Sequence, residues 1–384
     1  MNRRRFLRNG IVAMGAGALA PSALAGAGRW AETGWTDIPV GRPRGAAGEI
    51  RLSANENALG ISPAARQAII DGIGSANRYP FAAKMSLGRT LAERHGLEPE
   101  SVLLTNGSTE MIQVVVQALR TPDLRVVVAD PTFEDILEFA EPQASEVVKV
   151  PLLPDRAHDL DAMERVASEG SAPVLAYVCN PNNPTGTLTP SANVDRWIAS
   201  APENVFFLVD EAYFEFVESD GYHSALSWVH ENPRVVVART FSKVHGMAGM
   251  RLGYGVAHPD FMAQLRPWAP TTNTNQLALV AAAASLDDPD HVRRSLDANT
   301  EAKTILTDTL DELGLAHLPS HTNFVMHEIK GDLRLYRNRM RESGFLVGRP
   351  FPPFTEHNRL SLGLPEEMTA FVETLREFRD RGWV

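Results

Sequence analysis

Cysteine, long apolar runs and widespread positive charge are all scarce in this sequence of 384 residues. Cys179 is the only cysteine, so no disulfide can form within the chain, even in an oxidising compartment. It lies in the apolar run VLAYVC and is most simply a buried core residue. No stretch approaches the roughly 20 consecutive apolar residues of a membrane-spanning helix, so we expect no such helix. Hydrophobic residues make up 44% of the chain, which is ordinary for a globular protein and argues against disorder.

The first residues differ from the rest. They carry four arginines, all within NRRRFLR, and no acidic residue before position 25. A stretch rich in glycine and alanine runs from 10 to 20, and ALA at 23–25 offers a small-x-small cleavage site. NRRRFLR also resembles the twin-arginine export signal. We therefore expect 1–25 to be a twin-arginine-type signal peptide of a periplasmic protein that folds around a cofactor before export. The alternative is an uncleaved basic arm or an N-terminal anchor.

The charge of the remaining chain argues against one class of partner. Removal of 1–25 takes four of the 37 basic residues, so 33 remain against 47 acidic residues, a net charge of −14. So acidic a chain is a poor ligand for nucleic acid. We expect neither nucleic-acid binding nor membrane binding after signal cleavage, and the sequence offers no metal-ligand pattern. Basic groups in a binding site would have to be local.

Apolar, β-branched runs alternate with helical patterns between about residues 84 and 268. Strands are expected at 102–105, 125–129, 147–150, 174–179, 205–209, 235–239 and 252–256. Helices are expected between several of them, as at 109–119 and 194–199. Continuous apolar strands joined by helices predict an α/β fold with a mostly parallel sheet covered on both faces.

The pattern changes after residue 270 and predicts a second, smaller α/β unit. Helices are expected at 275–286, 289–313 and 366–378, and strands at 323–327 and 359–362. We divide the chain into a signal peptide (1–25), an N-terminal arm with part of the small domain (26–75), a large domain (76–270) and a small C-terminal domain (271–384).

Four short motifs follow expected strands, where parallel sheets gather their chemistry. TFSK ends at Lys243; burial or a nearby cation makes a lysine nucleophilic by lowering its pKa, although a lone lysine is usually a solvated surface residue. DEAY begins at Asp210, a carboxylate that could contact a ring nitrogen or simply cap a helix. NGSTE at 106–110 opens a helix and suits a phosphate or an ordinary capping box. NPNNPTG at 180–186 is either a rigid turn whose amides point inward toward a ligand or a tight turn on the surface.

Taken together, NGSTE, NPNNPTG, DEAY, TFSK and GMRLGYG in this order resemble the fold-type I, class I/II aminotransferases, which use pyridoxal phosphate. Within that group the chain is most similar to the histidinol-phosphate aminotransferase family. The resemblance runs from NENALG at 55–60 to RLSLG at 359–363. It implies a large pyridoxal-phosphate-binding domain, a smaller C-terminal domain and a homodimer with its sites at the interface.

The resemblance also implies roles for particular residues. Lys243 would form a Schiff base with the cofactor aldehyde and later move a proton at the substrate α-carbon. Asp210 would keep the pyridine nitrogen protonated, which makes the ring an electron sink. Asn183 and Tyr213 would hydrogen-bond the phenolic oxygen of the ring, and Phe133 would stack on it. The phosphate would be bound by Gly107, Ser108, Thr109, Ser242 and Arg251, with Tyr79 reaching it from the partner subunit.

The resemblance suggests the substrate side as well. Arg359 would bind the anionic end of the substrate, since a planar guanidinium suits a carboxylate or phosphate. Arg349 matches a second arginine of the histidinol-phosphate branch, and Asn55 and Asn57 match a loop over the substrate. The partners would be a small amino donor, glutamate among them, and a 2-oxo acid acceptor.

Three functions remain open at this point. The first is an exported aminotransferase acting on a histidinol-phosphate-like, aromatic or other amino compound; export weighs against a housekeeping role in histidine biosynthesis. The second is a decarboxylase or other α-carbon lyase with the same cofactor. The third is a binding protein that keeps the fold without catalysis, and the presence of Lys243, Asp210 and Arg359 together argues against it.

Overall fold

The computed structural model describes residues 48–144 and 146–384, and its largest element is a seven-stranded sheet. In spatial order the strands are β2 (Val102–Thr105), β8 (Gly253–Ala257), β7 (Val235–Thr240), β6 (Val205–Asp210), β5 (Val174–Cys179), β3 (Arg125–Asp130) and β4 (Glu146–Pro151). β8 is antiparallel to both of its neighbours, whereas β7, β6, β5, β3 and β4 pair in parallel. The predicted mostly parallel sheet is confirmed.

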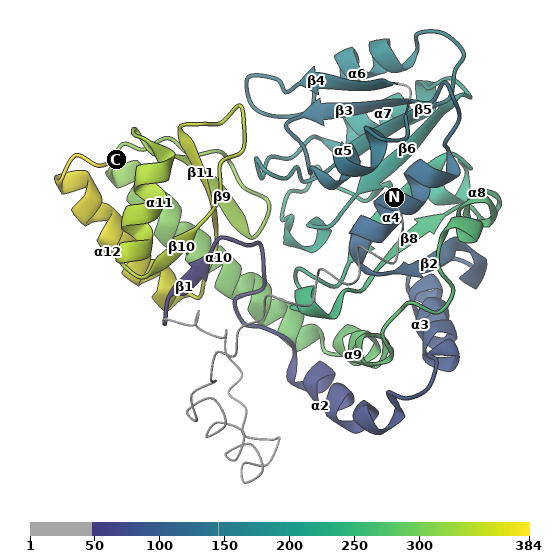
Figure 1. Ribbon diagram of the computed structural model, residues 1–384, viewed down its shortest axis with the longest axis horizontal. Helices are drawn as coiled ribbons and strands as arrows, with labels where there is room; N and C mark the ends of the chain where they lie inside the picture. Colours follow the sequence, from purple (N-terminus) through teal and green to yellow (C-terminus); the bar gives the residue numbers. More distant parts are fainter. Residues whose placement is uncertain (1–47, 145) are drawn as a thin grey trace, which may run out of the picture. The chain divides into compact units, whose positions relative to one another are not determined.

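Helices cover both faces of this sheet because its strands are apolar on both sides (Figure 1). Along β3, Val127 packs toward one face and Val126 and Val128 toward the other, as the two-residue period of a strand requires. One face is covered by α4 (Gly107–Ala118), α5 (Asp135–Ala140) and α8 (Pro259–Leu265). The other is covered by α3 (Phe81–Arg94), α6 (Leu160–Ala167), α7 (Ser191–Ser200) and α9 (Gln276–Leu286).

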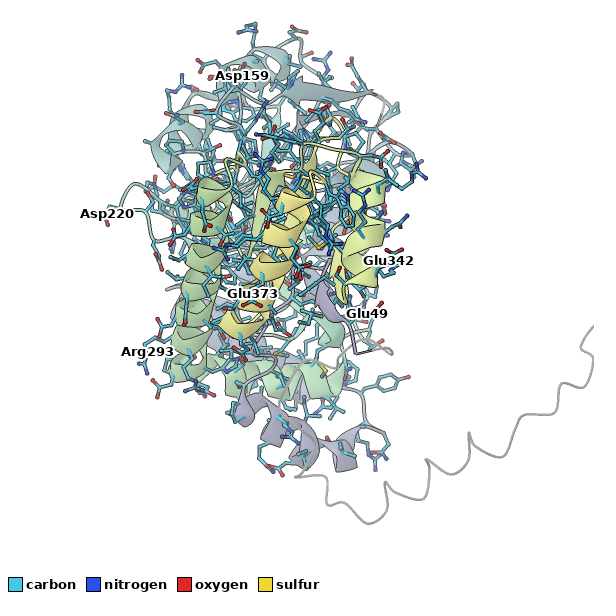
Figure 2. The ribbon with its side chains drawn as sticks, turned by 90° about the vertical axis from the view of Figure 1, so that its left-hand side faces the viewer. Glu49, Asp159, Asp220, Arg293, Glu342 and Glu373 are labelled. Atoms are coloured by element: carbon cyan, nitrogen blue, oxygen red, sulfur yellow. The ribbon has the colours of Figure 1, made fainter. Side chains whose placement is uncertain are left out.

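A smaller lobe has its own core. It contains two two-stranded sheets: β1 (Ile50–Leu52) pairs in parallel with β10 (Phe345–Val347), and β9 (Phe324–Glu328) pairs antiparallel with β11 (His357–Ser361). Helices α10 (Pro289–Glu312), α11 (Leu333–Glu342) and α12 (Pro365–Asp380) pack on these strands through buried residues such as Leu306, Tyr336 and Phe371. Their outer sides are charged, as the labelled Arg293, Glu342 and Glu373 show in Figure 2.

The division between the two units differs from the predicted one. Helix α9 was assigned to the small domain, but its buried Ala278 and Leu279 belong to the core under the large sheet. Helix α2 (Pro63–Gly72), from the segment 26–75, packs against α9. The reason is composition: LALVAAAASL in α9 is apolar all round, so the helix is buried between layers.

Short 3₁₀ helices are found at Ile73–Ser75, Pro99–Ser101, Phe214–Phe216, Ala225–His230, Ala248–Met250 and Arg266–Trp268.

Within the described residues, no helix is both long and apolar enough to cross a membrane. The predicted signal peptide lies outside the described residues.

Candidate active site

The carboxyl ends of β3, β5, β6 and β7 open on one edge of the sheet, and the start of antiparallel β8 lies at the same edge. A cavity of about 780 Å³, which includes open solvent at its mouth, lies there. Ten of its lining residues were predicted for the site: Asn55, Ser108, Thr109, Phe133, Asn183, Asp210, Tyr213, Ser242, Lys243 and Arg251. Sequence reasoning missed the other six: Ala54, Glu56, Cys179, Ala212, Thr240 and Ala248.

Lys243 lies in the turn after β7 with its amine in the cavity. Its Nζ donates a hydrogen bond of 3.0 Å to the backbone oxygen of Asn55 and lies 5.2 Å from the centre of the Tyr213 ring. The Tyr213 hydroxyl accepts a 2.9 Å hydrogen bond from the Asn55 side chain. Asn55 in turn accepts one of 2.6 Å from Ser361 at the end of β11. The amine is therefore held between the two lobes.

Asp210 forms the floor of the cavity at the end of β6. Its carboxylate accepts hydrogen bonds from the Tyr177 hydroxyl at 2.9 Å and from the Ala212 amide at 3.1 Å. Burial raises the pKa of Asp210 to about 6, and these two donors partly oppose the shift. A buried carboxylate with such a raised pKa suits a cationic partner placed in the cavity. Tyr177 was missed because a tyrosine inside an apolar strand has the pattern of a core residue.

An anion-binding corner lies where α4 begins beside β8. Gly107 opens α4 with φ +75°, and a Cβ on it would stand 2.5 Å from Nη2 of Arg251. The backbone of Arg251 is also in the left-handed conformation, with φ 55°, and its Nη1 lies 3.4 Å from the Ser242 hydroxyl. Unpaired amides at a helix start, a guanidinium and a hydroxyl form a suitable phosphate site. Thr109 lines the same corner, although its hydroxyl donates to Asp135 at 2.6 Å.

Arg359, on β11, reaches the cavity wall through Asn183. Its Nη1 donates to Oδ1 of Asn183 at 2.8 Å, and its side chain is 9% exposed. Nε has no hydrogen-bond partner among the described residues. Burial lowers the pKa of Arg359 to about 10, so the guanidinium remains charged at neutral pH. A buried cation with an unused donor beside a cavity suits an anionic ligand.

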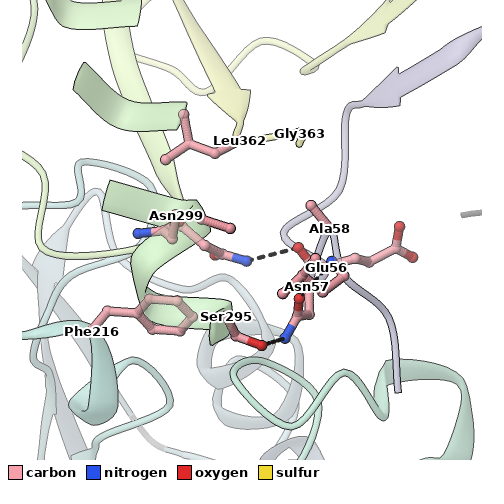
Figure 3. A pocket seen from close by; sticks show the side chains of 11 residues that line it. Glu56, Asn57, Ala58, Phe216, Ser295, Asn299, Leu362 and Gly363 are labelled. Carbon is pink, nitrogen blue, oxygen red and sulfur yellow. Dashed lines mark hydrogen bonds between the residues drawn. The ribbon is translucent and has the colours of Figure 1, made fainter. Parts of the chain in front are cut away.

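Three predicted residues lie elsewhere. Arg349 forms an ion pair with Glu134, next to Phe133, rather than lining the cavity. The Asn57 amide donates to Val244 O at 2.7 Å and to Ser295 Oγ at 2.9 Å, in a small neighbouring pocket (Figure 3). The Asn57 side chain therefore fixes its own loop through these hydrogen bonds and does not face the cavity.

Tyr79 is 74% exposed and lines a separate hollow with Thr272 and Asn275, so one chain alone does not bring it to the site.

The donor set fits one kind of group. The corner at Gly107, Ser242 and Arg251 suits a phosphate, Asp210 suits a protonated ring nitrogen, and the Lys243 amine can attack a carbonyl carbon. A phosphorylated pyridine aldehyde carries all three features. Among the residues that the structure describes, no cluster of three or more metal-ligating side chains could hold a metal ion.

Comparison with known proteins gives the same answer. The family model for aminotransferase class I and II matches residues 47–375. Histidinol-phosphate aminotransferase 1 of Nitrosococcus oceani is 36% identical over 346 residues, which cover 88% of this chain and 92% of that protein.

Two solved structures agree. One, from Erwinia carotovora atroseptica and provisionally described as a histidinol-phosphate aminotransferase, superposes with TM-score 0.86 at 39% identity, covering 88% of this chain and 98% of the other. The histidinol-phosphate aminotransferase from Sinorhizobium meliloti in complex with pyridoxal-5′-phosphate gives TM-score 0.80 at 26% identity, covering 87% of this chain and 91% of the other.

The geometry of the cavity and these similarities lead to one conclusion: the chain belongs to the class I and II aminotransferases and is a pyridoxal-phosphate-dependent enzyme that resembles the histidinol-phosphate aminotransferases.

Proposed function

We propose that this aminotransferase moves an amino group from an amino donor with an anionic end to a 2-oxo acid. The observation that carries this proposal is Arg359, a buried guanidinium with an unused Nε beside the cavity. Leaving a buried charge without a full set of partners is costly, so the residue is best explained by a carboxylate or phosphate of the substrate. The planar fork of arginine binds such groups with two parallel hydrogen bonds.

Five of the residues that line the cavity have a task in this reaction. The cofactor, when bound, withdraws electrons from the substrate α-carbon. Lys243 would hold the cofactor covalently and, as a free amine, would move the proton at that carbon. Asp210 would stay ionised to pair with the ring nitrogen, and Tyr213 and Asn183 would offer hydrogen bonds to the ring oxygen. The Asn55 carbonyl, 3.0 Å from Nζ, orients the Lys243 amine.

The names of the relatives suggest a histidinol-phosphate-like donor, and an aromatic amino acid is the other donor that the sequence leaves open. Export of the enzyme would separate it from cytoplasmic intermediates of histidine biosynthesis, which favours amino acids available outside the cytoplasm. We test this by mixing the purified enzyme, loaded with pyridoxal phosphate, with single donors: histidinol phosphate, phenylalanine, tyrosine and glutamate. Stoichiometric conversion of the cofactor to pyridoxamine phosphate, read by absorbance, supports the proposal. Release of carbon dioxide without that conversion would instead identify a decarboxylase.

Export through the twin-arginine route is part of the proposal, supported by NRRRFLR and by the ALA site at 23–25. Folded export would carry the cofactor along with the protein. Changing Arg3 and Arg4 together to lysine should keep the full-length protein in the cytoplasm, as fractionation and immunoblotting would show. Undiminished export of that variant would refute the twin-arginine assignment.

A further inference from the structure

The hydroxyl of Tyr213 has a neighbour that decides which way its proton points. Tyr213 is buried, and Phe324 packs edge-on against its ring at a centroid distance of 5.4 Å. The hydroxyl accepts a 2.9 Å hydrogen bond from Nδ2 of Asn55. A hydroxyl has one proton to donate and lone pairs with which to accept. While it accepts from Asn55, its own proton is free to point into the cavity that both residues line.

The amide of Asn55 is held in turn by Ser361. Ser361 lies at the end of β11, is fully buried, and donates from Oγ to Oδ1 of Asn55 at 2.6 Å. An amide turned by half a revolution exchanges its donor and its acceptor, so two arrangements are compatible with the heavy-atom positions. In the second arrangement Tyr213 would donate to Asn55, and Asn55 would donate to Ser361. The proton of Tyr213 would then point away from the cavity.

The ring oxygen of the cofactor selects between the two arrangements. This oxygen belongs to a phenol, and in its ionised form it can only accept hydrogen bonds. Tyr213 must then donate to it, which requires Asn55 to donate to Tyr213 and Ser361 to donate to Asn55. Only this direction satisfies every group of the chain at once.

The loop that carries Asn55 is fixed independently of its amide. The backbone oxygen of Asn55 accepts the 3.0 Å hydrogen bond from Lys243, and the backbone oxygen of Glu56 accepts one of 3.0 Å from the Asn323 side chain. The Asn57 side chain adds its two hydrogen bonds. A change confined to the amide of Asn55 should therefore leave the loop in place.

We propose that Asn55 is a positioning residue that directs the hydroxyl proton of Tyr213 to the ring oxygen of the cofactor, and that Ser361 fixes the amide in the orientation that this requires. The inference rests on the proposed function, in which Tyr213 donates to that oxygen. It gives the small lobe a part in the chemistry of the ring, because Ser361 belongs to β11. If Asn55 only joined the two lobes, its hydrogen bonds would matter but their direction would not.

The test reverses the direction and keeps the shape. In Asn55→Asp, a carboxylate of nearly the same size can only accept, so both Tyr213 and Ser361 would donate to it. The ring oxygen loses one donor, and the bound cofactor holds its proton to higher pH. We expect the midpoint of the pH-dependent absorbance change of the bound cofactor to rise by about one pH unit or more.

The Tyr213→Phe background separates this effect from the new charge, since a carboxylate also attracts protons. Asn55→Asp carries the same charge there, but no hydroxyl is left to redirect. We expect it to raise the midpoint by about one pH unit less in this background than in the wild type. The comparison cancels the other charged groups around the cavity, which are Glu56, Asp210, Lys243, Arg251 and Arg359.

Ser361→Ala tests the same arrangement without a new charge. It removes the donor that fixes the amide, so we expect the midpoint to rise by less than in Asn55→Asp, and the rise to vanish in the Tyr213→Phe background. Ser343→Ala is the matched control, because Ser343 is an exposed serine of the small lobe and its loss should leave the midpoint unchanged.

The inference is overturned if Asn55→Asp raises the midpoint equally with and without the Tyr213 hydroxyl, or if Ser361→Ala leaves it unchanged. These outcomes are distinguishable from failure of the proposed function. If Tyr213→Phe raises the midpoint and Asn55→Asp does not, the ring contact of Tyr213 stands and the role of Asn55 falls. If Tyr213→Phe itself leaves the midpoint unchanged, the proposed task of Tyr213 falls and takes this inference with it.

Discussion

Asp210 is the residue whose environment differs most from that of an ordinary carboxylate. It is 1% exposed, and its two described donors are a phenol and a backbone amide, neither of which is charged. Removing a charge from water without a cationic partner is costly. The site is therefore electrostatically incomplete until a protonated ring nitrogen occupies it. Such perturbed groups are typical of functional sites.

This imbalance predicts a pH dependence for the cofactor-free protein. The pKa of Asp210 is raised from 3.8 to about 6. Between pH 4 and 6, therefore, the folded state keeps a proton on this carboxyl that the unfolded state has already released. The stabilisation is full only well below pH 4 and is lost as the pH rises through 6. We expect the free energy of unfolding of the wild type, relative to Asp210→Asn, to fall by about 2 kcal/mol between pH 4 and 7.

Urea titrations of both cofactor-free proteins at several pH values measure this difference, and the Asn variant cancels the other titrating groups. A difference that stays flat across this range would mean that Asp210 is ionised throughout.

At the level of elements, the site depends on how strand ends and one helix start come together. β8 runs against its neighbours, so its beginning, and with it Arg251, lies where the parallel strands end. Gly253 at that beginning packs so closely that a Cβ would stand 2.7 Å from the Ser108 amide nitrogen. The phosphate corner therefore exists because two glycines allow α4 and β8 to touch.

Gly107→Ala tests that contact. The added Cβ would lie 2.5 Å from Arg251 Nη2, at φ +75°, where an alanine is also strained. We expect the affinity for pyridoxal phosphate to fall by on the order of tenfold or more, since the substitution displaces a charged phosphate ligand. Titration of the cofactor-free protein by absorbance measures it.

Gly88→Ala is the matched control, because a Cβ there meets nothing within 4 Å and alanine favours the helix. Equal cofactor affinity in the two variants would contradict the assignment of this corner to the phosphate.

Much of this element-level arrangement could be predicted from the sequence. The apolar strands and the polar residues after them share one edge in any parallel sheet, so Lys243, Asp210 and Asn183 could be grouped in advance. The direction of β8 could not, because a strand pattern has no polarity. Tyr177 and Glu134 were not predicted for a similar reason. Tyr177 has the sequence pattern of a core residue and Glu134 that of a solvated surface residue, and only the packing shows what each contacts.

At the scale of the whole molecule, the two lobes share the site. Ser361 and Arg359 from the small lobe meet Asn55 and Asn183 around the cavity. Residue Tyr79 is the exception, since it is largely exposed, as are Phe81 and Met85 nearby. We propose that these residues meet a second copy of the chain, and that the hydroxyl of Tyr79 completes the phosphate site of the partner.

Mixed dimers test this proposal. Tyr79→Phe should lower cofactor affinity on the order of tenfold, because a hydrogen bond to a charged group contributes about 1.5–3 kcal/mol, and Lys243→Ala should be inactive. Dimers refolded from both variants contain one site with Lys243 and an intact partner tyrosine. We expect that site to bind the cofactor with wild-type affinity and to transaminate. A monomer by sedimentation, or mixed dimers no better than Tyr79→Phe alone, would rule the arrangement out.

The central claim is that the amine of Lys243 carries the cofactor. The holoenzyme is reduced with borohydride, digested and mapped by mass spectrometry, with Lys243→Ala treated in parallel. The account predicts that the pyridoxyl phosphate label lies on the peptide containing Lys243 and is absent from the variant. A label on another lysine, or no label on a protein that binds the cofactor, would contradict it.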